Sequence, residues 1–386
     1  MTKESPMRNG IDVLLEQEGA DLRGMRVGLI TNPSGVTAGL ESTIDALRRS
    51  PGVSLAALFA PEHGLSASVA DGQPFASATD RRTGLPIYSL YHGQDKGPTP
   101  EMLRGLDALV LDIQDVGARF YTFISSMVEA MTAVAECGLA FIVLDRPNPI
   151  SGTILEGPIL DLAFQSFIGC HNIPIRHGLT MGELARLVNQ ERSLGAKLTV
   201  IPMAGWRREM WFDETGLPWV PPSPAMPNLA TATLYPGMCL LEGTNVSEGR
   251  GTALPFQVAG APWVDGYALA EMLNRLDLPG VRFRPSQFRP AASKWLGQLC
   301  EGVQVHVRDR QPFRAVRTAL HIIAAIRQMY LDQFAWRERH FDLLMGSDAT
   351  RLALDAGRPL EEIVASWETG LAVFARRRES CLIYAT

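Results

Sequence analysis

The first half of the chain alternates short apolar runs with segments in which apolar residues recur every three or four positions. The short runs predict buried strands, and the periodic segments predict amphipathic helices. The predicted strands cover residues 25–32, 53–61, 85–91, 106–113, 139–146 and 197–203. The predicted helices cover residues 42–50, a stretch that begins near 100, 123–137 and 180–192. Because continuous apolar strands that alternate with helices need cover on both faces, the pattern predicts an α/β protein with a doubly wound parallel sheet.

Two of the predicted helices begin with recognisable capping residues. Ser42 stands where the N-cap of the first helix is expected, and its hydroxyl can accept from a backbone N–H of the first turn. Thr180 and Glu183 have the spacing of a capping box. These residues predict where both helices start.

The alternating pattern ends between Trp206 and Asn228, and residues 217–227 of this segment are rich in proline. Proline at this density excludes a helix or a central strand, so we expect an extended segment that crosses between two domains. We predict domains at residues 1–226 and 227–386. The second, smaller domain is expected to be α+β, with a helix near 231–241, a glycine-rich loop, a strand at 303–308, and long amphipathic helices from Phe313 and Pro359.

Composition narrows the class of protein. The 386 residues are 46% hydrophobic and 20% charged, as in an ordinary globular protein, which argues against disorder. The net charge of −5 lacks the basic footprint that phosphate backbones require, so no nucleic-acid partner is expected. The five cysteines form no C-x-x-C pair, which argues against a zinc knuckle or a dithiol motif, and most are expected to be buried.

The hydropathy pattern predicts neither a membrane span nor a leader. No uninterrupted apolar run reaches the ~18 residues that a membrane helix needs. Residues 1–17 lack the apolar core of a signal peptide. We therefore expect no membrane partner and a cytoplasmic location.

Polar residues gather where the predicted strands end, which is where ligands bind in a doubly wound sheet. The first strand ends in Thr-Asn-Pro-Ser-Gly at 31–35, which is not the G-x-G-x-x-G turn of a nicotinamide or flavin site. No cofactor is therefore expected. The candidates at the other strand ends are Glu62 and His63, then Asp112, Asp115, Arg119 and Tyr121, then Asp145, Arg146 and Asn148.

The second domain contributes a glycine-punctuated loop at residues 241–252 that holds Glu242, Asn245, Glu248 and Arg250. Such loops let the backbone approach a ligand closely. Cleavage of a glycosidic bond needs one carboxylic acid to protonate the leaving oxygen and a second carboxylate to attack, to activate water or to stabilise the cation. A carboxylate from each domain, facing across a cleft, meets that need.

Every candidate also has a structural alternative. Glu62 can serve as a helix cap or salt-bridge partner, and the aspartates commonly cap loops. The arginines can bind helix ends or those aspartates, and His63 and His177, each before a glycine, can be structural hydrogen-bonding groups. The chain has no H-E-x-x-H, H-x-H or H-x-x-E-H pattern and no G-x-S-x-G elbow, so neither a catalytic metal nor a serine hydrolase is expected.

Long blocks of the chain resemble the bacterial exo-β-N-acetylmuramidase family NamZ, formerly catalogued as a domain of unknown function. The similarity runs from residues 10–14 to the C-terminus. The matching blocks cover residues 26–33, 61–64, 111–122, 145–149, 219–224 and 242–251. Uninterrupted blocks of this length are specific.

The resemblance implies removal of terminal N-acetylmuramic acid from the non-reducing end of peptidoglycan fragments, so the expected partner is a small saccharide. It also implies a Rossmann-like N-terminal domain, a smaller C-terminal domain and a site between them. Glu62 matches the family's leading catalytic candidate, and the glycine-rich loop supplies the second acid at Glu242 or Glu248, with Glu248 slightly preferred. Some relatives carry secretion signals, whereas this sequence shows none.

Two other classes of function remain open from the residues. A phosphosugar enzyme or transferase would need a glycine-rich phosphate cradle after the first strand, and residues 32–36 supply one glycine and a proline. A non-catalytic saccharide binder needs no opposed carboxylates, so carboxylate-to-amide variants should leave its binding intact.

Specificity for the muramic sugar requires a group that recognises its lactyl carboxylate. An arginine fork can pair with a carboxylate bidentately. Arg119, Arg146 and Arg250 stand on the motif loops, and Arg250 is the first choice because of its flanking glycines. The alternative is that Arg250 neutralises Glu242 or Glu248.

Overall fold

The computed structural model describes residues 7–67, 76–92 and 95–385. The first six residues of the segment that we predicted not to be a signal peptide lie outside the described residues. Among the residues that are described, no helix is long and apolar enough to cross a membrane.

The first lobe contains a seven-stranded sheet in the order β11-β8-β7-β1-β2-β4-β3. Every pair is parallel except β3 with β4. The strands are β1 (Arg26–Thr31), β2 (Ser54–Ala60), β3 (Ala78–Thr79), β4 (Pro86–Ser89), β7 (Ala108–Asp112), β8 (Ala140–Leu144) and β11 (Lys197–Ile201). The six parallel strands have the order of a Rossmann sheet, and the order reverses between β1 and β7. The predicted Rossmann-like doubly wound fold is confirmed.

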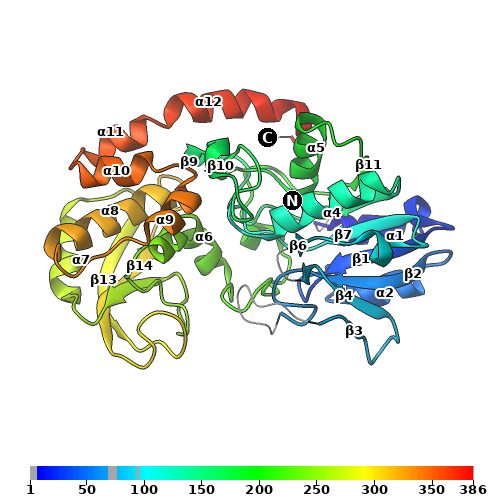
Figure 1. Cartoon of the computed structure of the whole chain (residues 1–386), viewed down its shortest axis with the longest axis horizontal. Helices are drawn as coiled ribbons and strands as arrows, with labels where there is room; N and C mark the ends of the chain where they lie inside the picture. Colours follow the sequence, from blue (N-terminus) through cyan, green and yellow to red (C-terminus); the bar gives the residue numbers. More distant parts are fainter. Residues whose placement is uncertain (1–6, 68–75, 93–94, 386) are drawn as a thin grey trace, which may run out of the picture.

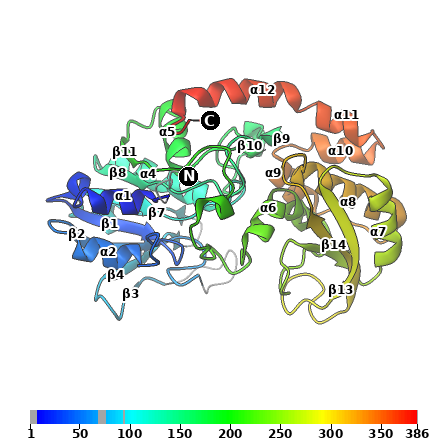
Figure 2. The same cartoon turned by 180° about the vertical axis from the view of Figure 1, so that it is seen from behind.

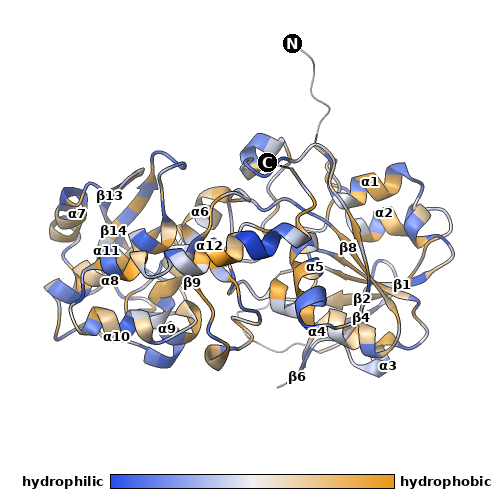
Figure 3. Cartoon of the chain, turned by 90° about the horizontal axis from the view of Figure 1, so that it is seen from above, coloured by the Kyte–Doolittle hydropathy of each residue, from blue (hydrophilic) through white to orange (hydrophobic). Residues whose placement is uncertain are grey.

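Helices cover both faces of this sheet, which Figure 3 shows nearly edge-on. Alternate strand residues divide between two cores, as the pleat requires. Val27 and Leu29 pack with α1 (Gly10–Glu16) and α2 (Thr43–Arg49). Ile30 and Phe59 belong to the core on the other face, which is shared with α3 (Pro100–Leu103), α4 (Phe123–Glu136) and α5 (Met181–Glu191).

Both predicted caps are confirmed. The Ser42 side chain accepts from the backbone N–H of Asp45 at the start of α2. Thr180 and Glu183 form a reciprocal capping box at the start of α5.

The second lobe joins a small antiparallel sheet to a set of helices, and it lies beside the first lobe with α6 between them (Figure 1). Its sheet has the order β12-β14-β13, formed by β12 (Val258–Ala261), β14 (Cys300–Val307) and β13 (Val281–Phe288). Its helical elements are α6 (Leu229–Met238), η4 (Cys239–Gly243), α7 (Gly266–Arg275), α8 (Ala315–Met329), α9 (Glu338–Met345) and α10 (Ala349–Asp355). Our prediction of one long helix from Pro359 is wrong in one respect. The segment forms two helices, α11 (Leu360–Ala365) and α12 (Glu368–Arg377).

Several short elements were not predicted because they are too brief to show a period. Two hairpins pair β5 (Tyr91–His92) with β6 (Asp95–Lys96) and β9 (Glu156–Ile159) with β10 (Pro174–Arg176). The short 3₁₀ turns are η1 (Ala20–Leu22), η2 (Leu162–Phe164), η3 (Phe212–Thr215) and η5 (Arg378–Cys381).

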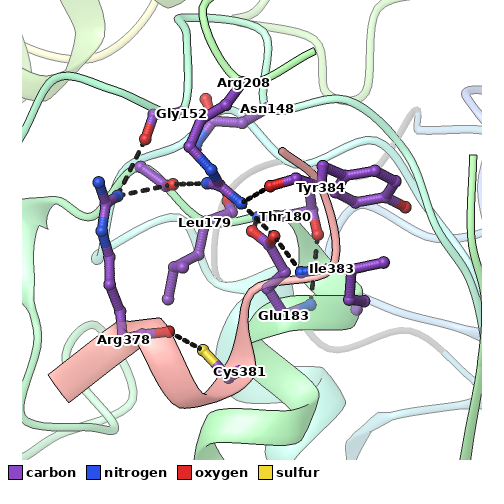
Figure 4. Close-up of polar contacts among 12 residues, drawn as sticks. Asn148, Gly152, Leu179, Thr180, Glu183, Arg208, Arg378, Cys381, Ile383 and Tyr384 are labelled. Carbon is purple, nitrogen blue, oxygen red and sulfur yellow. Dashed lines mark hydrogen bonds and ion pairs between the residues drawn. The ribbon is translucent and has the colours of Figure 1, made fainter. Parts of the chain in front are cut away.

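The C-terminal end of the chain returns to the first lobe. In Figures 1 and 2, α12 runs from the second lobe toward α5. Beyond it, Arg378 donates to the carbonyl oxygens of Gly152 and Gly178, and the backbone N–H of Ile383 donates to Glu183 (Figure 4). The last residues therefore complete the packing of the first lobe, and the division at residue 226 stays a prediction.

The proline-dense segment runs without helix or strand, as predicted. It crosses the end of β1, where the Asn32 amide donates to the carbonyl oxygen of Pro222 at 2.9 Å. Leu217, Pro218 and Val220 line a hollow of only about 10 Å³ beside Arg146. The chain itself thus fills the crevice at the switch point, where a Rossmann protein holds its dinucleotide. Four of the five cysteines are buried, as expected, and Cys137 is exposed.

Candidate active site

A cavity of about 140 Å³ opens between the two lobes. Residues from both lobes line it, so neither lobe forms the site alone. The first lobe contributes Glu62, His63, Phe120, Tyr121, Thr122, Phe123, Ile168, Ser223, Ala225 and Met226. The second contributes Tyr235, Cys239, Glu242, Arg250, Phe256, His340 and Leu344. Aromatic walls with a few convergent polar groups are typical of a small-molecule site.

Glu62 reaches this cavity from the turn that follows β2. The strand ends at Ala60, and the turn continues through Pro61, Glu62 and His63. His63 has φ of 71°, a left-handed conformation that few non-glycine residues adopt, and such strain clusters at functional sites. The Thr122 hydroxyl donates to Oε2 of Glu62. The carboxylate is therefore half-buried and held in one orientation at the sheet edge.

Glu242 faces the cavity from η4 in the second lobe. Its Oε1 accepts from Nε of Arg250 at 2.6 Å, and its Oε2 lies 3.7 Å from Nε2 of His340. Burial disfavours the charged form of Glu242. Arg250 and His340 outweigh burial, however, and lower the pKa of Glu242 to about 2. Glu242 is therefore an ionised carboxylate at neutral pH.

Glu248 lies behind this wall rather than on it. Its side chain is buried, and one oxygen lies 2.7 Å from Nζ of Lys294. Lys294 also donates to the carbonyl oxygens of Leu241 and Thr244, so this ion pair holds the glycine-rich loop in shape. The placement favours Glu242 over Glu248 as the second carboxylate, against our preference from the sequence.

Arg250 stands between two glycines, and the placement of its side chain depends on their backbone conformations. Gly249 and Gly251 have φ of 83° and 77°. A Cβ on Gly251 would come within 2.4 Å of the backbone nitrogen of Ala292. The loop can therefore lay the guanidinium over the Phe256 ring, 4.9 Å from its centroid, and against Glu242.

Asp112 and Arg146 form a buried ion pair at the switch point. Nε of Arg146 lies 2.5 Å from Oδ1 of Asp112, and its side chain also donates to the carbonyl oxygen of Val36. The Thr43 hydroxyl donates to Asp112 as well. Neither residue lines the cavity, and each is satisfied by other groups of the protein.

Asp145 and Asn148 anchor loops. Asp145 accepts from the Thr180 hydroxyl at 2.7 Å and from the Tyr384 hydroxyl at 2.6 Å. The Asn148 amide donates to the carbonyl oxygen of Leu179 at 3.0 Å. Neither residue lines the cavity. Both therefore have the structural role that the sequence analysis gave as the alternative to a role in the site.

Arg119 is buried and ties the two lobes together. Its guanidinium donates at 2.8 Å to the carbonyl oxygens of Pro158 and Ile173 in the first lobe and of Leu344 in the second. Burial lowers the pKa of Arg119 to about 9. It supports the cavity wall at Leu344 without lining the cavity.

Three further candidates also lie outside the cavity lining. Asp115 accepts from the backbone N–H of Gly117 at 2.7 Å, and burial raises the pKa of its carboxyl to about 7. His177 lies 3.8 Å from Asp115, and burial followed by the nearby arginines lowers its pKa to about 3. Asn245 bonds the backbone of Gln333 and Ala335.

The cavity therefore gathers five of the fourteen residues selected from the sequence: Glu62, His63, Tyr121, Glu242 and Arg250. It adds Thr122 and Ser223, which stand inside the family-like blocks but were not singled out. His340 was missed, because a lone histidine on an amphipathic helix carries no signal in the sequence. No group of three or more His, Cys, Asp or Glu placed to hold a metal occurs in the described part of the chain.

Comparisons with known proteins agree on one family. The N-terminal part of the exo-β-N-acetylmuramidase NamZ family matches residues 27–230, and its C-terminal part matches residues 233–384. The peptidoglycan β-N-acetylmuramidase NamZ of Bacillus subtilis (strain 168) is 48% identical over 383 residues, which is 99% of this chain and 92% of that protein.

Two crystal structures of DUF1343 family proteins from Bacteroides fragilis NCTC 9343 have the same fold. One has a TM-score of 0.92 at 40% identity, covering 99% of this chain and all of that one. The other has a TM-score of 0.79 at 32% identity and covers 99% of both chains. The chain belongs to the exo-β-N-acetylmuramidase NamZ family.

Proposed function

We propose that this protein is an exo-acting glycosidase that releases terminal N-acetylmuramic acid from the non-reducing end of peptidoglycan fragments. The observation that carries the proposal is the pair of carboxylates, Glu62 and Glu242, that line one cavity from opposite lobes. The family of the chain and the name of its Bacillus relative supply the substrate class.

In this proposal the two carboxylates have different duties. Arg250 and His340 hold Glu242 ionised, so it is unsuited to donate a proton at neutral pH. It is suited to attack, to activate water or to stabilise an oxocarbenium-like transition state. Glu62, whose Oε2 accepts from a hydroxyl, then moves the proton on the leaving oxygen as general acid or acid/base.

Arg250 serves this site in two ways. Its Nε–H orients Glu242. A guanidinium carries five N–H donors, so the same side chain can also pair with the lactyl carboxylate that distinguishes a muramic sugar from N-acetylglucosamine.

The chemistry is proposed to need no metal, because carboxylates and hydrogen-bond donors supply both proton transfer and charge stabilisation. The absence of a three-residue ligand group among the described residues is compatible with this. The expected cytoplasmic location stays a prediction, which cell fractionation tests.

The direct test uses a chromogenic β-N-acetylmuramide beside the matching glucosaminide. Release from the muramide at a far higher kcat/KM is the expected result. Binding without release, unchanged in carboxylate-to-amide variants, would instead assign the protein to the class of saccharide-binding proteins.

A further inference from the structure

A lysine stands beside Glu62 on the hairpin formed by β5 and β6. The backbone N–H of Leu90 donates to the carbonyl oxygen of Ala60 at 2.9 Å, so the hairpin starts at the end of β2, two residues before Glu62. Tyr91 and Lys96 are partners in the hairpin ladder. The backbone thus brings Lys96 next to the turn that carries Glu62.

The Lys96 ammonium lies between two aromatic rings. Nζ is 3.4 Å from the centroid of the Tyr91 ring and 4.5 Å from that of Phe167. The two rings meet edge to face at 5.5 Å. A cation between ring faces is attracted to both, so the ammonium is held in place instead of extending into solvent. Burial lowers the pKa of Lys96, and the attraction of the Glu62 charge opposes that effect.

The same hairpin also supplies a hydroxyl to Glu62. The Tyr91 hydroxyl is hydrogen-bonded with Glu62 and with Thr122, whose own hydroxyl donates to Glu62. Tyr91 is almost fully buried. Two hydroxyls of the first lobe therefore bond the Glu62 carboxylate, and the charge of Lys96 on the same hairpin as Tyr91 acts on it as well.

The other charged or titratable groups around Glu62 do not replace this cation. His63 neighbours Glu62 on the same turn, and Tyr121 lies on the loop after β7. Across the cavity, Arg250 and His340 are both engaged with Glu242. Lys96 does not line the cavity itself; among the described residues it is a cation of the first lobe whose charge acts on Glu62.

We propose that Lys96 is a positioning residue that stabilises the ionised form of Glu62 between its proton transfers and thereby sets the pH range of activity. The inference rests on the proposed role of Glu62. Its physical basis is that an opposite charge nearby favours the ionised form of a carboxyl group, and that fixed hydroxyl donors do the same.

The test is the pH dependence of kcat/KM on the muramide for Lys96→Met and Lys96→Arg. In the Lys96→Met variant, the limb of the pH profile that reports the ionisation of Glu62 should move to higher pH by roughly one unit. The other limb should stay in place. Lys96→Arg keeps the charge and the ring contacts, so its profile stays close to that of the wild type. Lys197→Met is the matched control, because it removes the same charge from an exposed side chain on β11.

Other outcomes contradict the inference. A lower rate with both limbs unmoved reduces Lys96 to a packing role. A rise in KM for the muramide alone makes Lys96 a substrate contact. Thermal unfolding of each variant identifies loss of fold, and Lys96→Gln replaces the Met variant if that one unfolds. If the wild type releases no muramic sugar, the proposed function fails, whereas a wild-type profile retained in Lys96→Met overturns this inference alone.

Discussion

Two regions at the cleft-facing side of the molecule each pair a carboxylate with an arginine, and they differ in how much of the pair is exposed. At the ends of β7 and β8, the Asp112 and Arg146 side chains are 0% and 4% exposed. In the cavity, the Glu242 and Arg250 side chains are each 20% exposed. The chemistry of the two pairs is the same, so only their surroundings separate a structural ion pair from a candidate site.

The surroundings differ for a physical reason. A buried charge pair is tolerated when further hydrogen bonds satisfy both partners, and Thr43 and Val36 do this for Asp112 and Arg146. The proline-dense segment then closes the crevice over them. Of the residues that the structure describes, none fills the space between Glu62 and the second lobe, which leaves both carboxylates on the wall of one cavity.

The largest effect is expected from Glu62→Gln, which keeps the shape and removes the titrating group. General acid/base catalysis contributes ~10²–10⁴-fold, so kcat/KM on an unactivated disaccharide should fall by that factor. The melting temperature should stay close to that of the wild type. A near-normal rate on that disaccharide would rule out Glu62 as the acid/base.

Asp112→Asn tests the buried ion pair of Asp112 with Arg146. Breaking a buried pair leaves an uncompensated charge, so the free energy of unfolding should fall by about 3–5 kcal/mol in urea titrations. The folded fraction should retain the wild-type kcat/KM, because Asp112 does not line the cavity. A stable variant that has lost turnover would instead make Asp112 part of the site.

Arg250→Ala should lower specificity for the muramide by about one to two decades, since a charge-assisted pair is worth roughly 1.5–3 kcal/mol. Turnover of the glucosaminide should fall as well, because Glu242 loses its orienting donor, but by less than turnover of the muramide. The measurement is kcat/KM on both substrates. An equal fall would assign Arg250 to the orientation of Glu242 alone.

Glu242 should also show in the pH dependence of stability. Its pKa is lowered from 4.5 to about 2, so its contribution is fully present above the unfolded value and is lost as the pH falls toward the folded one. The difference in unfolding free energy between the wild type and Glu242→Gln should therefore shrink as the pH falls below about 4.5. A difference that does not change over this acid range would mean that Glu242 is not held ionised by its partners.

The smallest effect is expected from chelation. Exhaustive EDTA treatment should leave kcat/KM on the muramide unchanged, because proton transfer and charge stabilisation are assigned to carboxylates. Loss of activity that a stoichiometric divalent ion restores would overturn this mechanism.

The local sequence pattern was enough to predict the parallel strands of the sheet and the strand ends where the candidate site begins. The apolar runs predicted every parallel strand to within a few residues, because a strand covered on both faces must be apolar along its length. The capping residues Ser42 and Thr180 marked helix starts because their side chains bond the adjacent turn. Glu62 was selected for the same kind of local reason, as it follows a strand end directly.

Which charged residues come together depends on how the chain folds in three dimensions. Glu242 and Glu248 stand in one loop, yet their surroundings differ. Glu248 is buried and pairs with Lys294, whereas Glu242 lines the cavity and pairs with Arg250. Arg119 was a candidate by type, yet its partners are carbonyl oxygens from distant segments. Lys96 and His340 carry no motif; a helix of the second lobe brings His340 to the cavity, and a hairpin of the first lobe holds Lys96 against the Tyr91 ring. Whether a charged side chain is buried, paired or open to a ligand depends on residues that are distant in the sequence. The local sequence pattern around that side chain contains no information about them.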